Sequence, residues 1–124
     1  MGSGRGRSVL LVEDDADIRL VSSIALGRVG GFEVTGVGTV ADARAALARG
    51  APDVILLDVH LPDLDGPSFA RELAAHEMFA HVPIVLLTGH PVSDDLPAHV
   101  IGAIQKPFDA MTLAGRIRTI CGWA

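Results

Sequence analysis

Four short apolar runs in this sequence each stop at a polar residue that suits metal or phosphate chemistry. These residues are Glu13 and Asp14, Asp58, Thr88, and Lys106. Carboxylates with no sulfur ligand beside them favour a hard divalent cation such as Mg²⁺. An aspartate held against that ion can attack a phosphoryl group and form an aspartyl-phosphate, while a hydroxyl and an ammonium group bind the phosphoryl oxygens. Taken singly, each residue is more simply an ordinary strand-end residue, so the hypothesis depends on the whole set.

These groups meet only if the apolar runs are neighbouring strands of one parallel sheet. Continuous aliphatic runs suit strands buried on both faces, whereas an alternating run suits an exposed edge strand. The continuous runs are residues 8–12, 54–57, 82–87 and 100–105, and the alternating run is residues 32–37. Helical spacing and capping signals predict helices over residues 18–29, 40–49 and 67–78, and after Asp109. Pro91 and Pro97 leave room only for a short or distorted helix between them.

The alternation of five strands with five helical segments predicts an α/β fold. We expect a flavodoxin-like, doubly wound, five-stranded parallel sheet of strand order 2-1-3-4-5, with a fourth helix that is short or irregular. Its switch point lies between strands one and three, where Glu13, Asp14 and Asp58 would converge. Two such charges about 4 Å apart repel by on the order of 4 kcal/mol. Lys106, the only lysine in the chain, supplies one counter-charge, so the cluster predicts a bound cation.

Length and composition indicate a single globular domain. The chain has 124 residues, 49% of them hydrophobic, and we expect a flexible tail over residues 1–7 and one domain over residues 8–124. A net charge of −5 argues against direct nucleic-acid binding. No run reaches transmembrane length, no signal peptide is recognisable, and a single cysteine excludes an internal disulfide. We therefore predict a soluble, cytoplasmic monomer or weak dimer that contacts neither a membrane nor nucleic acid.

From Ser8 to Gly122 the sequence resembles the receiver domain of bacterial two-component response regulators. The motifs that carry the resemblance are Leu-Val-Glu13-Asp14-Asp15, Leu-Leu-Asp58, the loop Leu61-Pro62-Asp63-Leu64-Asp65-Gly66, Leu-Leu-Thr88-Gly89, and Lys106-Pro107-Phe108. In this order the set is specific for the family. The resemblance implies that Asp58 is the phosphoacceptor and that Asp14 binds Mg²⁺ directly, with Glu13 assisting through water. It also implies that the His60 backbone carbonyl is a metal ligand.

The same resemblance implies a switch and a set of partners. Thr88 would be the switching hydroxyl, and Lys106 would contact the phosphoryl group. That group would come from a phosphohistidine on a sensor histidine kinase or a histidine phosphotransfer protein, and a downstream output protein would read the change. The sequence departs from the family at Ala103, where an aromatic residue often partners the threonine, and in the short interval from Thr88 to Lys106. Both departures affect the output more than the chemistry.

Two other functions compete with a phosphoaccepting receiver, which catalyses only its own phosphorylation and dephosphorylation. A pseudo-receiver would bind partners without phosphorylation, although every acceptor-site residue is present here. A phosphohydrolase with an aspartate nucleophile would carry a second acid two residues after it, and His60 occupies that position.

Two histidines follow site residues at equal spacing. His60 lies two positions after Asp58, and His90 lies two positions after Thr88, so both could form the rim of the acid pocket together with Gly89. Paired imidazoles beside carboxylates could bind Zn²⁺ or Cu²⁺. The simpler interpretation is that they are rim residues that control water access.

Overall fold

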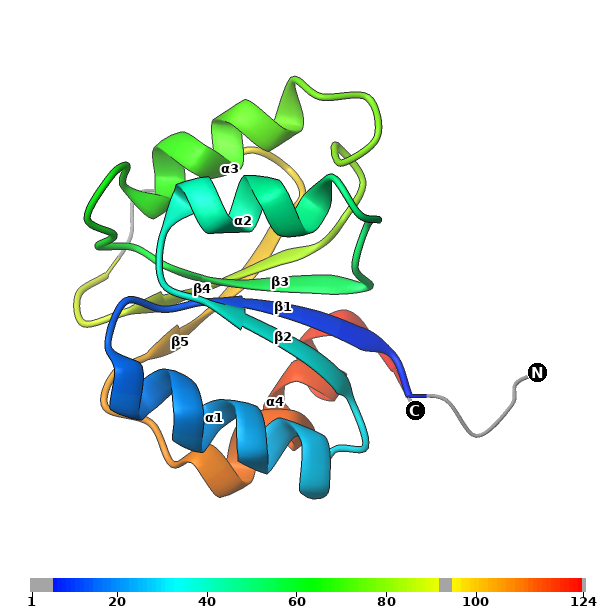
Figure 1. Cartoon of the computed structure of the whole chain (residues 1–124), viewed down its shortest axis with the longest axis vertical. Coiled ribbons are helices and arrows are strands. Elements are labelled where there is room, and N and C mark those ends of the chain that lie inside the picture. Colours follow the sequence, from blue (N-terminus) through cyan, green and yellow to red (C-terminus); the bar gives the residue numbers. More distant parts are fainter. Residues whose placement is uncertain (1–5, 92–94, 124) are drawn as a thin grey trace.

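A computed structural model describes residues 6–91 and 95–123, which form one parallel sheet with helices on both faces (Figure 1). The five strands are β1 (Ser8–Val12), β2 (Glu33–Val37), β3 (Val54–Asp58), β4 (Ile84–Thr88) and β5 (Val100–Gln105). The helices found in these residues are α1 (Ala16–Arg28), α2 (Val40–Leu47), α3 (Gly66–Ala74) and α4 (Ala110–Cys121). The strand order is β2-β1-β3-β4-β5, with every neighbouring pair parallel, so the predicted flavodoxin-like order is confirmed.

The central strands owe their position to their unbroken apolar runs. Every residue of β3 and of β4 is buried, including the polar residue that ends each strand. β2 is largely exposed and pairs only with β1, as the alternating pattern predicted for an edge strand. β5 forms the other edge and buries only Ile104 fully. Asp58 and Thr88 therefore lie at the carboxyl ends of the two fully buried strands.

Two apolar clusters, one on each face of the sheet, pack the helices against the strands. α2 and α3 cover one face, where Phe69 and Leu73 pack against Ile55, and α1 and α4 cover the other (Figure 1). On that second face, Leu26 packs with Leu113 and neighbouring strand residues. Burying a side chain of this size contributes about 1.5–3 kcal/mol, so the two clusters hold the strand ends firmly in register.

The helix boundaries differ in part from the predictions. α2 ends at Leu47 rather than at residue 49, and α3 ends at Ala74 rather than at residue 78. The chain leaves α3 early through a tight turn, in which the His76 N–H donates to the Leu73 carbonyl at 3.0 Å. This turn allows Phe79 and Val82 to be buried against the same apolar cluster as α3.

In the sequence, Ile18, Val21, Ala25 and Val29 recur at helical spacing and indicate one apolar face for α1, but only part of this face is buried. Ala25 is buried, but Val21 and Val29 are 55% and 51% exposed. The buried face instead comprises Ser22, Ala25 and Leu26. The sequence also indicates inward-facing apolar residues in α3 and α4, and the structure confirms them: Phe69, Ala70, Leu73, Leu113 and Ile117 are buried, and Ile120 packs against the same cluster as α4.

The fourth of the five predicted helical segments, between Thr88 and Val100, is not helical where the structure describes it. Residues 89–91 and 95–99 contain turns and irregular backbone, and residues 92–94 of that expected segment lie outside the described range. Most of the expected tail, residues 1–5, lies outside it as well. The described residues include no helix that is long and apolar enough to span a membrane.

An aromatic contact lies at the edge of the sheet where the strands begin. The Trp123 ring centroid is 6.2 Å from that of Phe32, and the Arg7 guanidinium lies 4.4 Å from the Trp123 centroid. The Arg118 guanidinium lies 4.8 Å from the Phe32 centroid and donates to the Gly30 carbonyl. These contacts join the two ends of the described chain at the edge opposite to the acidic residues (Figure 1).

Candidate functional site at the carboxyl edge of the sheet

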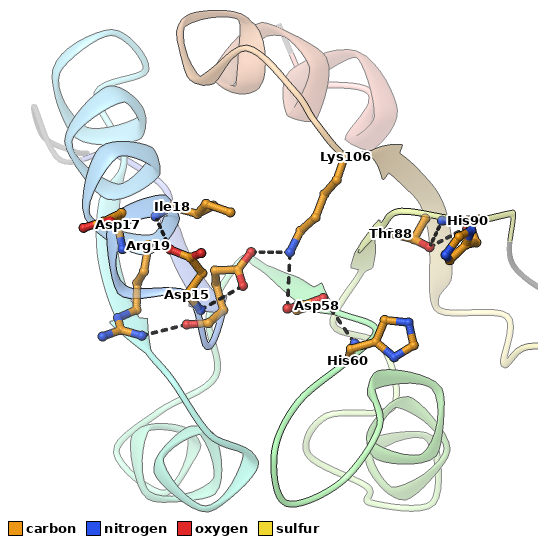
Figure 2. Close-up of polar contacts among 10 residues, drawn as sticks. Asp15, Asp17, Ile18, Arg19, Asp58, His60, Thr88, His90 and Lys106 are labelled. Atoms are coloured by element: carbon orange, nitrogen blue, oxygen red, sulfur yellow. Dashed lines mark hydrogen bonds and ion pairs between the residues drawn. The ribbon is translucent and has the colours of Figure 1, made fainter.

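The structure brings the predicted site residues to one edge of the sheet from four different strands, and Figure 2 shows Asp58, Thr88 and Lys106 among them. Glu13 and Asp14 follow β1, and Asp58 and Thr88 are the last residues of β3 and β4. Lys106 follows β5 directly, and its N–H donates to the Thr88 carbonyl at 2.7 Å. Because the strands are parallel, their carboxyl ends bring these five residues to the same edge of the sheet.

Three carboxyl groups form the centre of the site. Glu13, Asp14 and Asp58 each place one carboxylate oxygen within 4.8 Å of the others. Glu13 is fully buried and Asp58 is 4% exposed, whereas Asp14 is exposed to solvent. Among residues 6–91 and 95–123, this is the only group of three or more acidic, histidine or cysteine side chains arranged to hold a metal ion. Oxygen donors at this spacing, two of them buried, fit a hard cation such as Mg²⁺.

Lys106 supplies the positive charge that faces the buried acids. Its Nζ lies 2.6 Å from Glu13 Oε1 and 3.3 Å from Asp58 Oδ2, between the two side chains (Figure 2). Burial raises the pKa of Glu13 to about 7, even though the bond from Lys106 acts in the opposite direction. Burial also tends to lower the pKa of Lys106, but the hydrogen bond to Glu13 and the charge of Asp58 outweigh it, so this pKa is raised. The ammonium group therefore stays charged and bridges both acids.

The turn after β1 is held by its own side chains. Asp15 is the N-cap of α1 and accepts hydrogen bonds from the backbone N–H groups of Asp17 and Ile18 at 2.9 and 3.0 Å. The Asp15 N–H donates to Glu13 Oε2 at 3.2 Å, and the Glu13 N–H donates to the Val37 carbonyl on β2 at 2.9 Å. The helix thus starts at the acid cluster, with its N-terminal dipole beside the negative charge.

The loop after β3 folds back closely on Asp58. Asp58 Oδ1 accepts a hydrogen bond from the His60 N–H at 3.2 Å. Gly66 lies so near that an added Cβ would stand 2.4 Å from the Asp58 carbonyl oxygen, so only glycine fits there. Asp63, in the same loop, accepts from the N–H groups of Val40 and Ala41 at 2.9 Å each and thereby joins the loop to the start of α2. The direction of the His60 carbonyl toward a metal stays a prediction.

The Thr88 hydroxyl is occupied by its own strand end. It donates to the His90 carbonyl at 2.5 Å and accepts from the His90 N–H at 3.1 Å (Figure 2). The side chain is 6% exposed, so the hydroxyl exchanges these bonds only for other protein or ligand partners. Thr88 therefore ties residues 88–90 together in the present conformation.

The two predicted rim histidines share one pocket beside the acids. This cavity of about 300 Å³ is lined by Val59, His60, Pro67, Arg71, Thr88, His90, Pro91 and Leu96. Gly89 lies in the bend between Thr88 and His90. Ala103 lies on β5 and is exposed. Because alanine has no ring, this position gives the buried Thr88 no aromatic partner.

Sequence reasoning missed two contacts that shape the site. The Asp63 cap joins groups 22 and 23 residues apart, and no local pattern signals it. The Arg19 guanidinium donates to the Glu13 backbone carbonyl at 2.7 Å, and a lone arginine in a predicted helix carries no signal of such a contact. Gly36 and Gly38, on either side of Val37, are a sequence hint of close packing at the end of β2.

The sequence of this chain is similar to those of known proteins. A sequence model of the family described as "Response regulator receiver domain" matches residues 9–118. The transcriptional regulatory protein GltR of Pseudomonas aeruginosa is 39% identical over 125 residues, covering 95% of this chain and 50% of that protein. The transcriptional regulatory protein CseB of Streptomyces avermitilis is 37% identical over 116 residues, covering 90% and 48%. The chain thus spans about half the length of these curated relatives.

Solved structures show the same fold. The chemotaxis response regulator CheY4 of Vibrio cholerae has a TM-score of 0.83 and 27% identity, covering 93% of this chain and 98% of that one. The receiver domain of the sensor histidine kinase PA1611 from Pseudomonas aeruginosa has a TM-score of 0.79 and 32% identity, covering 94% and 98%. That structure is described with a magnesium ion coordinated in its active-site cleft.

Proposed function

This chain belongs to the response regulator receiver domain family, and we propose that it takes a phosphoryl group from a phosphohistidine onto Asp58. One observation carries this proposal. A buried aspartate at the end of a central strand lies 3.3 Å from the only lysine and within 4.8 Å of two further acids. Holding these acids together costs electrostatic free energy, which a bound cation would offset while a phosphoryl group is transferred. We assign residues 8–124 to this receiver domain.

The acid cluster fits Mg²⁺ as the cofactor. Asp14 and Asp58 would hold the ion together with the His60 backbone carbonyl, and Glu13 would assist through water. When bound, the cation offsets the negative charge that gathers on the phosphoryl oxygens during transfer. The exposure of Asp14 supports this assignment, because a ligand open to solvent leaves the ion free to keep several waters.

The protein residues have separate tasks in the transfer. An Asp58 carboxylate oxygen forms the new O–P bond while the N–P bond of the phosphohistidine breaks, and that electron pair returns to the imidazole. Lys106 already touches Asp58, so its ammonium group can follow the phosphoryl oxygens with a small movement. The reaction modifies the protein itself, in keeping with a family that signals rather than turning over a separate substrate.

Thr88 supplies a route from the phosphoryl group to the loop after β4. Phosphorylation adds about −1.5 to −2 charge and three acceptor oxygens. To donate to one of them, the Thr88 hydroxyl must release the His90 carbonyl that it now holds. Its release would change the loop directly, and this supports a switch that works without an aromatic residue at Ala103.

The phosphodonor would be a sensor histidine kinase or a histidine phosphotransfer protein, and the domain would act in the cytoplasm. A surface beside the acid site supports such docking. Leu20, Val21 and Ile24 on α1 are 60%, 55% and 49% exposed. Val21 also lines a cavity of about 470 Å³ that reaches Lys106 and Phe108. A partner that covers these apolar side chains would hold its histidine close to Asp58, and an output protein would then read the altered loop after β4.

The acceptor assignment is tested by intact-mass analysis with Mg²⁺ and acetyl phosphate. The parent protein should gain one phosphoryl group, and Asp58→Ala should gain none. Asp42→Ala, which removes an exposed carboxylate from α2, is the matched control and should label like the parent. Full labelling of Asp58→Ala would refute the acceptor assignment. If only Asp58→Ala fails to label, phosphotransfer from candidate kinases of the source organism would identify the donor.

A further inference from the structure

The side chain of Arg19 reaches from α1 to the backbone of the turn after β1. It starts on α1, is half-buried, and directs its guanidinium back to the turn that carries the acids (Figure 2). Nη1 donates to the Glu13 backbone carbonyl at 2.7 Å. Because this bond comes from a charged donor, it is stronger than a bond between two neutral groups. The contact fixes the peptide that immediately precedes Asp14.

Two glycines make the space for this path. A Cβ added at Gly36, in β2, would lie 3.2 Å from Arg19 Cγ and 3.1 Å from Ser23 Oγ. A Cβ added at Gly38 would lie 2.8 Å from Arg19 Nη1 and 3.8 Å from the Glu13 carbonyl oxygen. Neither glycine is among those with positive φ in the described part of the chain, namely Gly31, Gly50 and Gly122. The two glycines are therefore explained by the room they leave for Arg19 rather than by backbone conformation.

Arg19 completes the restraint of Glu13 on every side. The Glu13 N–H is bonded to the Val37 carbonyl, its carboxylate is bonded to Lys106 and to the Asp15 N–H, and its carbonyl is bonded to Arg19. Asp14 is different, because it is exposed and its carboxylate has no hydrogen bond or ion pair to another residue in the part of the chain that the structure describes. The orientation of the Asp14 carboxylate thus depends on the two peptides that flank it.

We propose that Arg19 is a positioning residue for the metal and phosphoryl site, acting through the Glu13 carbonyl on the carboxylate of Asp14. The inference rests on the proposed function for its chemical meaning, since Asp14 is the ligand that Arg19 would orient. Residues that orient metal ligands typically change metal affinity about 10- to 100-fold when they are replaced. Gly36 and Gly38 support the same contact, because a side chain at either position would meet Arg19.

Two variants separate positioning from simple folding support. Arg19→Ala removes the contact. Gly38→Ala keeps the guanidinium in the protein but pushes it off the carbonyl, because the new Cβ meets only the flexible end of that side chain. Arg19→Lys keeps a donor of the same charge on a shorter stem and should restore part of the effect. Arg28→Ala, at the exposed far end of α1, removes the same charge away from the site and is the matched control.

The first measurement is Mg²⁺ affinity by isothermal titration calorimetry, without any phosphodonor. We expect Mg²⁺ to bind about 10-fold more weakly to Arg19→Ala and Gly38→Ala, less than threefold more weakly to Arg19→Lys, and as in the parent to Arg28→Ala. In metal-free buffer, the amide protons of Asp14 and Asp15 should exchange faster in the first two variants. The initial rate of labelling by acetyl phosphate should fall in the same order at low Mg²⁺ and recover at saturating Mg²⁺.

Unchanged Mg²⁺ affinity in a folded Arg19→Ala and in Gly38→Ala would overturn the inference, even if both unfolded at lower temperature. If Arg19→Ala does not fold, Gly38→Ala and Arg19→Lys decide the question. A parent protein that binds Mg²⁺ but accepts no phosphoryl group would refute the proposed function and leave the positioning of Asp14 measurable.

Discussion

Replacing Asp58 with asparagine should make the metal-free protein more stable, although it removes a buried group that contacts Lys106. At an effective dielectric near 20, the 3.3 Å separation from Lys106 Nζ gives Asp58 about 5 kcal/mol of attraction. Glu13 and Asp14 each place an oxygen within 4.8 Å and repel it by about 3.5 kcal/mol apiece. The balance is unfavourable by about 2 kcal/mol when all three acids are ionised. Asparagine is isosteric and keeps an oxygen that can accept from the His60 N–H.

The stability that Asp58→Asn gains over the parent protein should increase with pH. The pKa of Glu13 is raised from 4.5 to about 7, with burial as the largest cause and Asp58 as a further one. A raised folded-state pKa means that stability is fully present below the unfolded value and is lost as the pH rises through the folded value. The parent should therefore lose stability from about pH 5 to about pH 8, and Asp58→Asn should flatten that decline. The difference between the two proteins should be larger near pH 8 than near pH 6.

The assay is urea unfolding with a chelator, near both pH values. We expect Asp58→Asn to be more stable by about 2 kcal/mol near pH 8. Glu77→Gln, which removes one exposed carboxylate far from the site, should change stability by less than about 0.5 kcal/mol. Saturating Mg²⁺ should reverse the ranking, since a ligand at 100 times its Kd stabilises the parent by about 2.7 kcal/mol. A metal-free variant that is less stable than its parent near pH 8 would show that the repulsion is not stored in the fold.

Two further predictions concern the loops beside the site. Asp63→Ala should lower the urea concentration at which the protein unfolds, because it leaves the N–H groups of Val40 and Ala41 without their acceptor. Asp63→Asn keeps one acceptor oxygen and should lower it less. Equal stability of all three proteins would contradict the capping role. Phosphorylation should change amide hydrogen exchange in residues 89–91 and 95–100 more than in α4, because Thr88 must release the His90 carbonyl. Exchange in those residues that is slow and unaltered by phosphorylation would exclude this route of signalling.

The sheet and its site could be predicted because both depend on short, strongly patterned segments. β3 and β4 are continuous apolar runs that end in a polar residue, so one pattern fixed both the burial of the strand and the position of Asp58 and Thr88. The face of α1 could not be read in the same way. Leu20, Val21 and Ile24 are as apolar as the buried Leu26, so hydrophobic spacing alone does not select a face. Packing against α4 and the sheet made that choice.

The remaining contacts lie beyond the reach of sequence patterns because one partner in each is a backbone group. Arg19 binds the carbonyl of Glu13, and Asp63 binds the N–H groups at the start of α2. Every residue carries a carbonyl, and nearly every residue an N–H, so side-chain type says nothing about which one will be chosen. The end of α3 at Ala74 is similar, since burial of Phe79 and Val82 outweighs local helix preference there.

The position of Trp123 has a practical consequence for optical measurements. It is the only tryptophan in the chain, and with Phe32 and Arg7 it lies at the edge of the sheet opposite to the acid cluster. Its emission should respond strongly when the two ends of the chain separate on unfolding, and little when an ion or a phosphoryl group enters the far edge. The tryptophan fluorescence of this protein should therefore report unfolding alone. Binding of an ion or a phosphoryl group at the acid cluster needs a probe placed on the loops around it.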